Sequence, residues 1–253
     1  MVTVGQNLIV VTAGVITSLL LMALLNRAWP RENRFRENDL IGWQLGILGT
    51  TYAVILGFML YAVWTTFEEA DLNVDLEADA VLNTYRLAIG LPEPQRTQLQ
   101  SLTRSYVEAV INQDWPEMAR GEAPTQSAAI DNEMWTTVMS VRTTSAGEQA
   151  VGDHALSELS SLSQHRLTRT LQSGMQLPAV LWCVLLVGGA LTIVAACTFG
   201  EASVKLQTLQ VFSFSLLVSL SLVAIADIHR PFQGLIHIRP SAFQRAQQIM
   251  QGR

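Results

Sequence analysis

The sequence predicts an all-helical membrane protein with four transmembrane helices and a helical extramembrane insert between the second and the third. Three observations support this fold class. The chain of 253 residues is almost half hydrophobic but only 15% charged, which is an apolar balance for a soluble protein of this size. The apolar residues are concentrated at 1–66 and 177–226, and the residues between these regions are polar. No part of the polar region alternates in hydrophobicity as a strand does.

Four apolar stretches are long enough to cross a hydrocarbon core of about 30 Å, which takes roughly 20 helical residues. We expect transmembrane helices at about 7–26, 41–66, 177–199 and 204–226. Apart from Glu201 and Lys205, at the turn that joins the last two, these stretches hold no Asp, Glu, Lys or Arg. The predicted organisation is a helix pair at 1–67, an insert at 68–176, a second helix pair at 177–226 and a C-terminal tail at 227–253.

The first apolar stretch is interpreted as a retained helix. A cleaved signal peptide carries its basic residues before the apolar run, whereas the arginines of this chain come after it, at Arg27, Arg31, Arg34 and Arg36. The distribution of Lys and Arg does not decide which side of the membrane the insert occupies, because the two orientations give nearly equal counts.

The insert begins as an amphipathic helix that continues out of the second span, with apolar residues such as Val74, Ala78 and Val81 on one face. We expect a second helix at about 93–112, a loop at 113–127, a helix at about 128–142 and a last helix from about Ser145. Six carboxylates come after the second span, and we predict that they form a solvated face of a continuous helix and not a calcium loop. They are Glu68, Glu69, Asp71, Asp75, Glu77 and Asp79.

The chain lacks the residue patterns of an enzyme active site. It contains no nucleophile elbow, phosphate-binding loop or metalloprotease helix, and its four histidines have no metal-ligand spacing. We therefore predict that the protein is not an enzyme and holds no cofactor or metal. The net charge of −5 and the absence of a basic cluster argue against nucleic acid as a partner.

The second span carries two patterned stripes on roughly opposite faces. One stripe consists of small residues, which let another helix approach closely, and we predict that it packs helices. It contains Gly42, Gly46, Gly49, Ala53 and Gly57. The other has polar groups towards one end and bulky apolar groups deeper in, an arrangement that suits the lining of an oligomeric pore with a hydrophobic gate. It contains Gln44, Thr51, Ile55, Phe58 and Ala62. The alternative is that the second stripe faces lipid or another helix.

A cluster of turn-forming residues comes after the last span. Asp227 and Arg230 are three residues apart at the end of the helix, and Pro231, Phe232 and Gly234 predict a turn that lies back on the insert. We interpret the cluster as a structural clamp. The alternative is a vestibule that attracts anions.

This C-terminal segment, ADIHRPFQGLIHIRPSAF, appears in order after four other short motifs. These are LPEP at 91–94, WPEM at 115–118, LPAVLW at 177–182 and the Phe199–Gly200 turn. Together they resemble the bacterial bestrophin-like family, domain of unknown function 4239, over nearly the whole chain.

The resemblance implies two helix pairs that flank a cytosolic helical region, as in bestrophins, which are pentameric anion channels whose second span lines the pore. It also implies that the insert and both termini are cytoplasmic, in a bacterial inner membrane. The chain departs from bestrophins in lacking three aromatic residues on one pore-facing stripe, since Tyr52, Phe58 and Tyr61 do not share a face.

The leading functional hypothesis is an oligomeric ion channel or channel-like membrane protein, with the second span lining the pore. Its partners would be the lipid bilayer, further copies of the same chain and small ions. The alternative is a non-conducting membrane scaffold or sensor whose helical insert docks a partner. The two hypotheses differ in the oligomeric state that they require. A pore of this kind requires a closed ring of protomers, whereas a scaffold can be a monomer or a dimer.

Overall fold

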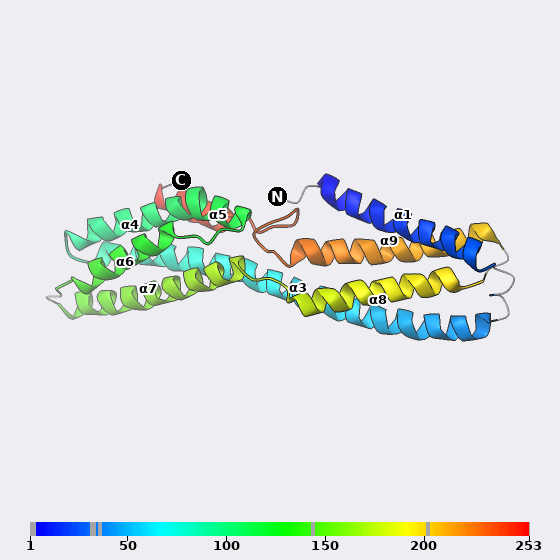
Figure 1. Cartoon of the computed structure of the whole chain (residues 1–253). Coiled ribbons are helices and arrows are strands. Elements are labelled where there is room, and N and C mark those ends of the chain that lie inside the picture. The colour runs from blue at the N-terminus through cyan, green and yellow to red at the C-terminus, as the bar shows by residue number, and fades with distance from the viewer. Residues whose placement is uncertain (1–3, 31–33, 35–36, 143–144, 201–202, 253) are drawn as a thin grey trace. The chain divides into compact units, whose positions relative to one another are not determined.

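The computed structural model describes residues 4–30, 34, 37–142, 145–200 and 203–252, and in these residues it contains helices and no strand (Figure 1). The elements succeed one another along the chain with short connections. They are α1 (Val4–Ala28), α3 (Asn38–Leu87), η1 (Ala88–Gly90), α4 (Gln95–Ala109), η2 (Val110–Asp114), α5 (Trp115–Arg120), α6 (Gln126–Met139), α7 (Ala146–Ser173), α8 (Ala179–Thr198), α9 (Val204–Ile228) and α10 (Ser241–Met250). The all-helical prediction is therefore confirmed.

The chain forms two compact units, which are described separately. The membrane unit consists of residues 2–65 and 176–229, and the insert unit consists of residues 66–175 and 230–253. The helix α3 contributes to both units, because it continues without interruption for 50 residues. Glu201, at the predicted turn between the last two spans, lies outside the described residues.

The membrane unit contains four helices that are long and apolar enough to cross a bilayer, as the sequence predicts. Within it α1 packs against α8 and α9, and α8 packs against α9. Gly14 permits the close approach of α1 to α9, because a Cβ atom at this position would lie only 2.6 Å from Ser219 Oγ. Large apolar side chains such as Leu8, Leu20 and Leu217 point outwards and are more than half exposed. In a bilayer such side chains contact lipid at no hydrophobic cost.

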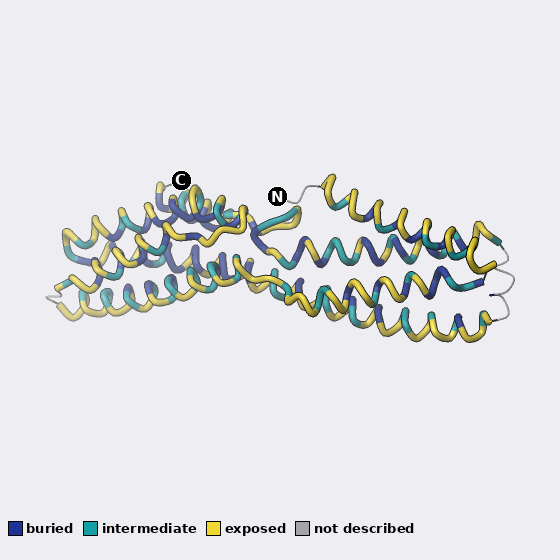
Figure 2. The backbone as a smooth tube through the Cα atoms, in the orientation of Figure 1, coloured by how far each residue is buried: buried dark blue, intermediate teal, exposed yellow. Residues whose placement is uncertain are grey.

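The insert unit has its own hydrophobic core, built from one face of each surrounding helix (Figure 2). The apolar face predicted for the second half of α3 is buried, with Val74 and Val81 at most 2% exposed. Leu99 and Tyr106 of α4 and Leu159 of α7 are fully buried in the same core. The burial of these apolar side chains removes apolar surface from water and so stabilises the insert unit.

The C-terminal tail contains a helix, α10, that is not among the helices expected from the sequence. Its buried residues recur every three to four positions and contact the core of the insert unit, with Phe243 fully buried. The carbonyl oxygen of Met250 at the end of α10 accepts hydrogen bonds from Tyr85 Oη (3.3 Å) and Arg104 Nη2 (3.4 Å). The tail is thus an integral part of the insert unit.

Candidate functional site

The predicted pore-lining stripe lies on the first half of α3, and the other helices of the membrane unit leave most of it uncovered. Gln44, Thr51 and Ala62 are largely accessible, and Phe58 is 71% exposed. Ile55 is half-buried. The stripe is therefore available to a pore, to lipid or to a second copy of the chain, and its role as a pore lining stays a prediction.

The small-residue stripe is also largely uncovered within the chain. A Cβ atom added at Gly46, Gly49 or Gly57 would meet no other atom within 4 Å, and Ala53 is exposed. Only Gly42 approaches another segment, since its Cβ would lie 3.3 Å from the ring of Phe199. If this stripe packs helices as predicted, the helices belong to another copy of the chain.

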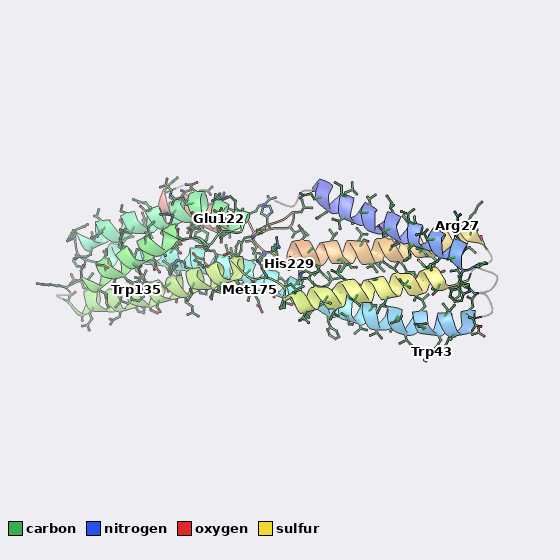
Figure 3. The ribbon with its side chains drawn as sticks, in the orientation of Figure 1. Arg27, Trp43, Glu122, Trp135, Met175 and His229 are labelled. Carbon is green, nitrogen blue, oxygen red and sulfur yellow. The ribbon has the colours of Figure 1, made fainter. Side chains whose placement is uncertain are left out.

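The side of α3 that does pack within the membrane unit is marked by Tyr52. The phenol Oη of Tyr52 donates a hydrogen bond of 2.9 Å to the carbonyl oxygen of Leu185 on α8. The Tyr52 ring lies against two glycines of α8, because a Cβ atom at Gly188 would come within 2.7 Å of it and one at Gly189 within 2.9 Å of its hydroxyl. Tyr52, one of three aromatics considered for the pore, thus serves to join α3 to α8. Trp43 lies on the outer side of α3 (Figure 3) and is 67% exposed.

A polar network closes one end of the membrane unit. Arg34 is fully buried, and its Nη1 donates a hydrogen bond of 2.7 Å to the carbonyl oxygen of Cys197, while its Nη2 bonds Asn26. Asn26 in turn donates to Gln207 Oε1 (3.0 Å), and Gln207 donates to the carbonyl oxygen of Phe199 (3.0 Å). These bonds satisfy carbonyl groups at the end of α8 that no intrahelical donor reaches. The sequence distinguished Arg34 only as one of several basic residues after the first span.

The residues of the predicted C-terminal clamp adopt a turn after α9. The amide of Gln233 donates to the carbonyl oxygen of Arg230 (3.0 Å), and Gly234 has a φ of +84°, a conformation that favours glycine. Phe232 packs edge-on against Trp115, with ring centroids 5.6 Å apart, in the core of the insert unit. Pro231 is buried too, as is Asp227 at the end of α9. The role of Asp227 and Arg230 in a structural clamp stays a prediction.

The most highly charged buried site lies in the insert unit and is centred on Arg169 of α7. Its Nε and Nη2 atoms bind both carboxylate oxygens of Glu77 on α3, at 2.7 and 3.0 Å. The Nη2 atom also donates to Asp114 Oδ2 at 3.0 Å, and Tyr106 Oη donates to Glu77 Oε1 at 2.6 Å. All four residues are fully buried. We call Arg169, Glu77, Asp114 and Tyr106 the arginine cluster.

A π-helical turn, η2, places Asp114 in the arginine cluster. Here the amide of Trp115 donates to the carbonyl oxygen of Val110, five residues earlier, where an α-helix would bond four residues earlier. The extra residue in this turn rotates the residues after it by about 100°, the angle of one α-helical residue. Pro116 follows at once inside the same continuous helical run, and its missing amide hydrogen removes one intrahelical bond where the bonding pattern changes. The predicted loop at 113–127 is therefore wrong for its first half, since only residues 121–125 lie outside a helix.

The electrostatics of the arginine cluster result from its burial. Burial opposes the charge of Arg169, but the Glu77 and Asp114 carboxylates overcome this and raise the pKa of the guanidinium, which stays charged. Burial and the neighbouring Glu77 carboxylate raise the pKa of Tyr106 well above its ordinary value, so the phenol remains a hydrogen-bond donor. Two carboxylates share one guanidinium, so the cluster carries an excess of negative charge when both are ionised.

The cluster corrects one prediction, because Glu77 is not part of a solvated acidic face. Glu77 is fully buried, whereas the other acidic residues of this part of α3 lie outside the buried core, as expected. A signal for this was present in the sequence. Helical periodicity places Glu77 on the same face as Val74, Ala78 and Val81, which are the apolar residues of this part of α3.

A second, partly buried ion pair lies between α6 and α7. Arg166 Nε donates to Asp131 Oδ2 at 3.1 Å, and Ser163 Oγ donates to Asp131 Oδ1 at 2.8 Å. Trp135 Nε1 completes the chain of bonds by donating to Ser163 Oγ at 2.9 Å. Among the described residues no group of three or more His, Cys, Asp or Glu side chains is placed to hold a metal ion.

Four apolar helices of membrane-spanning length, joined by a helical insert unit with its own core, define an integral membrane protein with an extramembrane helical region. The model of the bestrophin-like domain matches residues 12–243, which is most of the chain. The protein belongs to the bestrophin-like family, as the sequence motifs indicated.

Solved structures show the same fold. A point variant of a bacterial bestrophin homologue from Klebsiella pneumoniae superimposes with a TM-score of 0.70 at 14% identity, over 98% of this chain and 100% of that one. A second variant of the Klebsiella homologue gives a TM-score of 0.69 at 15% identity, with the same coverage of both chains. No curated protein matches this chain.

Proposed function

We propose that the protein is an oligomeric, bestrophin-like ion channel in which the first half of α3 lines the pore. The observation that carries this proposal is the uncovered face of α3, which presents Gln44, Thr51 and Phe58 away from the chain's own helices. The protein belongs to the bestrophin-like family, and bestrophins line their pore with the second span, so a pore-lining role would explain why this face is uncovered. In a ring of protomers the faces of several α3 helices would converge on a common axis.

The two stripes of α3 then have complementary roles. The stripe of Gly46, Gly49 and Gly57 has open space beside it within the chain, so a helix of the next protomer can approach closely. The opposite stripe faces the axis, with hydroxyl and amide groups at Thr51 and Gln44 and a narrow apolar section at Ile55 and Phe58. Hydrophobic constrictions of this kind gate pores by excluding water.

The family also supports a placement in the membrane. We propose that the insert unit and both termini are cytoplasmic, in a bacterial inner membrane, with lipid, neighbouring protomers and small ions as the partners. The mass of the purified protein in detergent, measured by light scattering with the detergent subtracted, tests the ring. A closed ring of five protomers is expected, and a monomer or dimer would exclude a central pore and favour a scaffold.

Replacing Phe58 with alanine is expected to raise ion leak through the reconstituted protein. The substitution removes the largest apolar side chain of the stripe, which widens the section that water must cross and weakens its exclusion. Ion flux from liposomes checks this, with Tyr61→Ala as a control, because Tyr61 is similarly exposed but lies off the stripe. An unchanged flux in a ring that has assembled normally would remove Phe58 from the gate.

A further inference from the structure

The arginine cluster joins two segments that lead directly into membrane spans. Glu77 lies on α3, the same continuous helix that carries the proposed pore lining. Arg169 lies four residues before the end of α7, and the next helix, α8, is a span. The two bonds between Arg169 and Glu77, at 2.7 and 3.0 Å, therefore fix the extramembrane part of α3 against the segment that precedes the third span.

The energetics of the cluster favour a positioning role over simple stabilisation. The free energy needed to remove two carboxylates and a guanidinium from water is about as large as the free energy of their attraction. Apolar side chains of similar volume would therefore stabilise the packing of these helices at least as well. The charges are also unequal, with Glu77 and Asp114 on one Arg169. The two carboxylates and the guanidinium come from three different helical elements, α3, η2 and α7. The Asp131–Arg166 ion pair lies further away, between α6 and α7.

The position of Asp114 in the cluster depends on the π turn. In the structure the five-residue bond between Trp115 and Val110 carries Asp114 to Arg169. A shift of this turn to α-helical bonding would rotate Asp114 away by about 100°. Turns of this type are single-turn features that often occur at functional sites. Withdrawal of Asp114 would leave Glu77 as the one carboxylate bound to Arg169. It would also weaken the attachment of α5, whose remaining hydrogen bond with the guanidinium would be through Met118 Sδ, at 3.5 Å from Nη1.

We propose that Arg169 is a positioning residue for the pore helix, and that the π turn and the arginine cluster together form a latch that sets the fraction of time the channel conducts. This inference rests on the proposed function. The latch acts through the extramembrane part of α3, so it changes the equilibrium between conducting and closed states and leaves the conduction path itself unaltered. A turn that can take either of two bonding patterns would give the extramembrane part of α3 two arrangements, and each arrangement would favour one state of the channel.

Single-channel recording of the full-length protein in planar bilayers tests the latch. Two variants weaken it without emptying the core: Asp114→Asn removes the second carboxylate charge, and Tyr106→Phe removes the donor to Glu77. Glu122→Gln is the matched control, because Glu122 pairs with Arg120 at an exposed position of the same unit (Figure 3). The first two variants are expected to change the open fraction in the same direction by about fivefold or more, with the unitary conductance of the wild type. The control is expected to change neither.

Hydrogen exchange of the same samples gives a second readout, in which Asp114→Asn speeds exchange of the amides at 110–115. If both variants assemble normally and have the open fraction and hydrogen exchange of the wild type, the latch is wrong, while the proposed channel function is unaffected. A wild-type ring that passes no current overturns the proposed function, and the latch with it. If Asp114→Asn does not fold, Tyr106→Phe decides the matter, since it removes only one hydroxyl group.

Discussion

Replacing Arg169 with leucine is expected to destabilise the insert unit by roughly 3–5 kcal/mol, the cost of breaking a buried ion pair by removing one partner. Leucine leaves the Glu77 and Asp114 carboxylates facing each other in a fully buried site without a counter-charge. It also removes the guanidinium that lies 5.8 Å from the ring of Trp115. The remaining carboxylates must take up protons or draw water into the core, and either change loosens the packing of α7 on α3.

The measurement is thermal unfolding of the detergent-purified protein, monitored by tryptophan fluorescence. Trp115 and Trp135 of the insert unit contribute to this signal together with the four tryptophans of the membrane unit. Arg245→Leu provides the control. Arg245 pairs with Asp75 at 3.1 Å, but both side chains are more than half exposed, and surface pairs of this kind contribute at most about 1 kcal/mol. Similar unfolding temperatures for the two variants would show that the arginine cluster does not hold the insert unit together.

Replacing Gly188 with valine is expected to separate α8 from α3 and to destabilise the membrane unit by about 1–3 kcal/mol, as overpacking of a closely packed interface does. Even the first added carbon atom would lie 2.7 Å from the Tyr52 ring, a distance that real Cβ contacts do not show. The ring is held by its hydrogen bond to the Leu185 carbonyl, so it cannot move aside without losing that bond.

Helical content during thermal unfolding, compared with that of Gly152→Val, measures this effect. Gly152 lies on α7, where a Cβ atom would meet nothing within 4 Å, so the same substitution should be tolerated there. A Tyr52→Ala change made together with Gly188→Val should recover part of the loss, because it removes the clashing ring. If Gly188→Val unfolds at the wild-type temperature, the contact between α3 and α8 is not as close as the structure shows.

The fold could be predicted from the sequence because it follows from patterns within short stretches of the chain. The lengths of the apolar stretches indicate the four spans, and the spacing of Val74, Ala78 and Val81 indicates that the second span continues as an amphipathic helix. The structure confirms both. The helix α10 was missed although its apolar residues, such as Ala242, Phe243 and Ala246, have helical spacing, because the helix is only ten residues long and follows a segment rich in turn signals.

The arginine cluster could be predicted only in part, since Glu77 and Arg169 are 92 residues apart. Helical periodicity does place each of them on an apolar face, with Arg169 seven residues after Leu162 and fourteen after Ala155. A charged residue at such a position indicates a buried partner but does not identify it. Pro116 indicates irregular helical bonding next to Asp114, but it does not indicate that the irregularity is a π turn.

The stripe of α3 that we propose lines the pore was recognised by its helical spacing, but its exposure is known only from the structure. The pore stripe and the small-residue stripe are both largely uncovered within one chain, as a ring of protomers requires. The role of Tyr52 could not be assigned from the sequence, because it depends on the glycines that face this residue from α8.

The most direct test of the central claim is chemical modification of a cysteine placed on the pore stripe. The background is Cys183→Ser, since Cys183 is exposed and Cys197 is buried. A charged thiol reagent applied to Thr51→Cys is expected to lower the unitary conductance, because it attaches a bulky group to each protomer in the conduction path. The control, Tyr61→Cys, is expected to conduct as before, because Tyr61 is 70% exposed on the same helix but belongs to neither stripe. An unchanged conductance in Thr51→Cys after complete modification would contradict a pore lined by this face of α3.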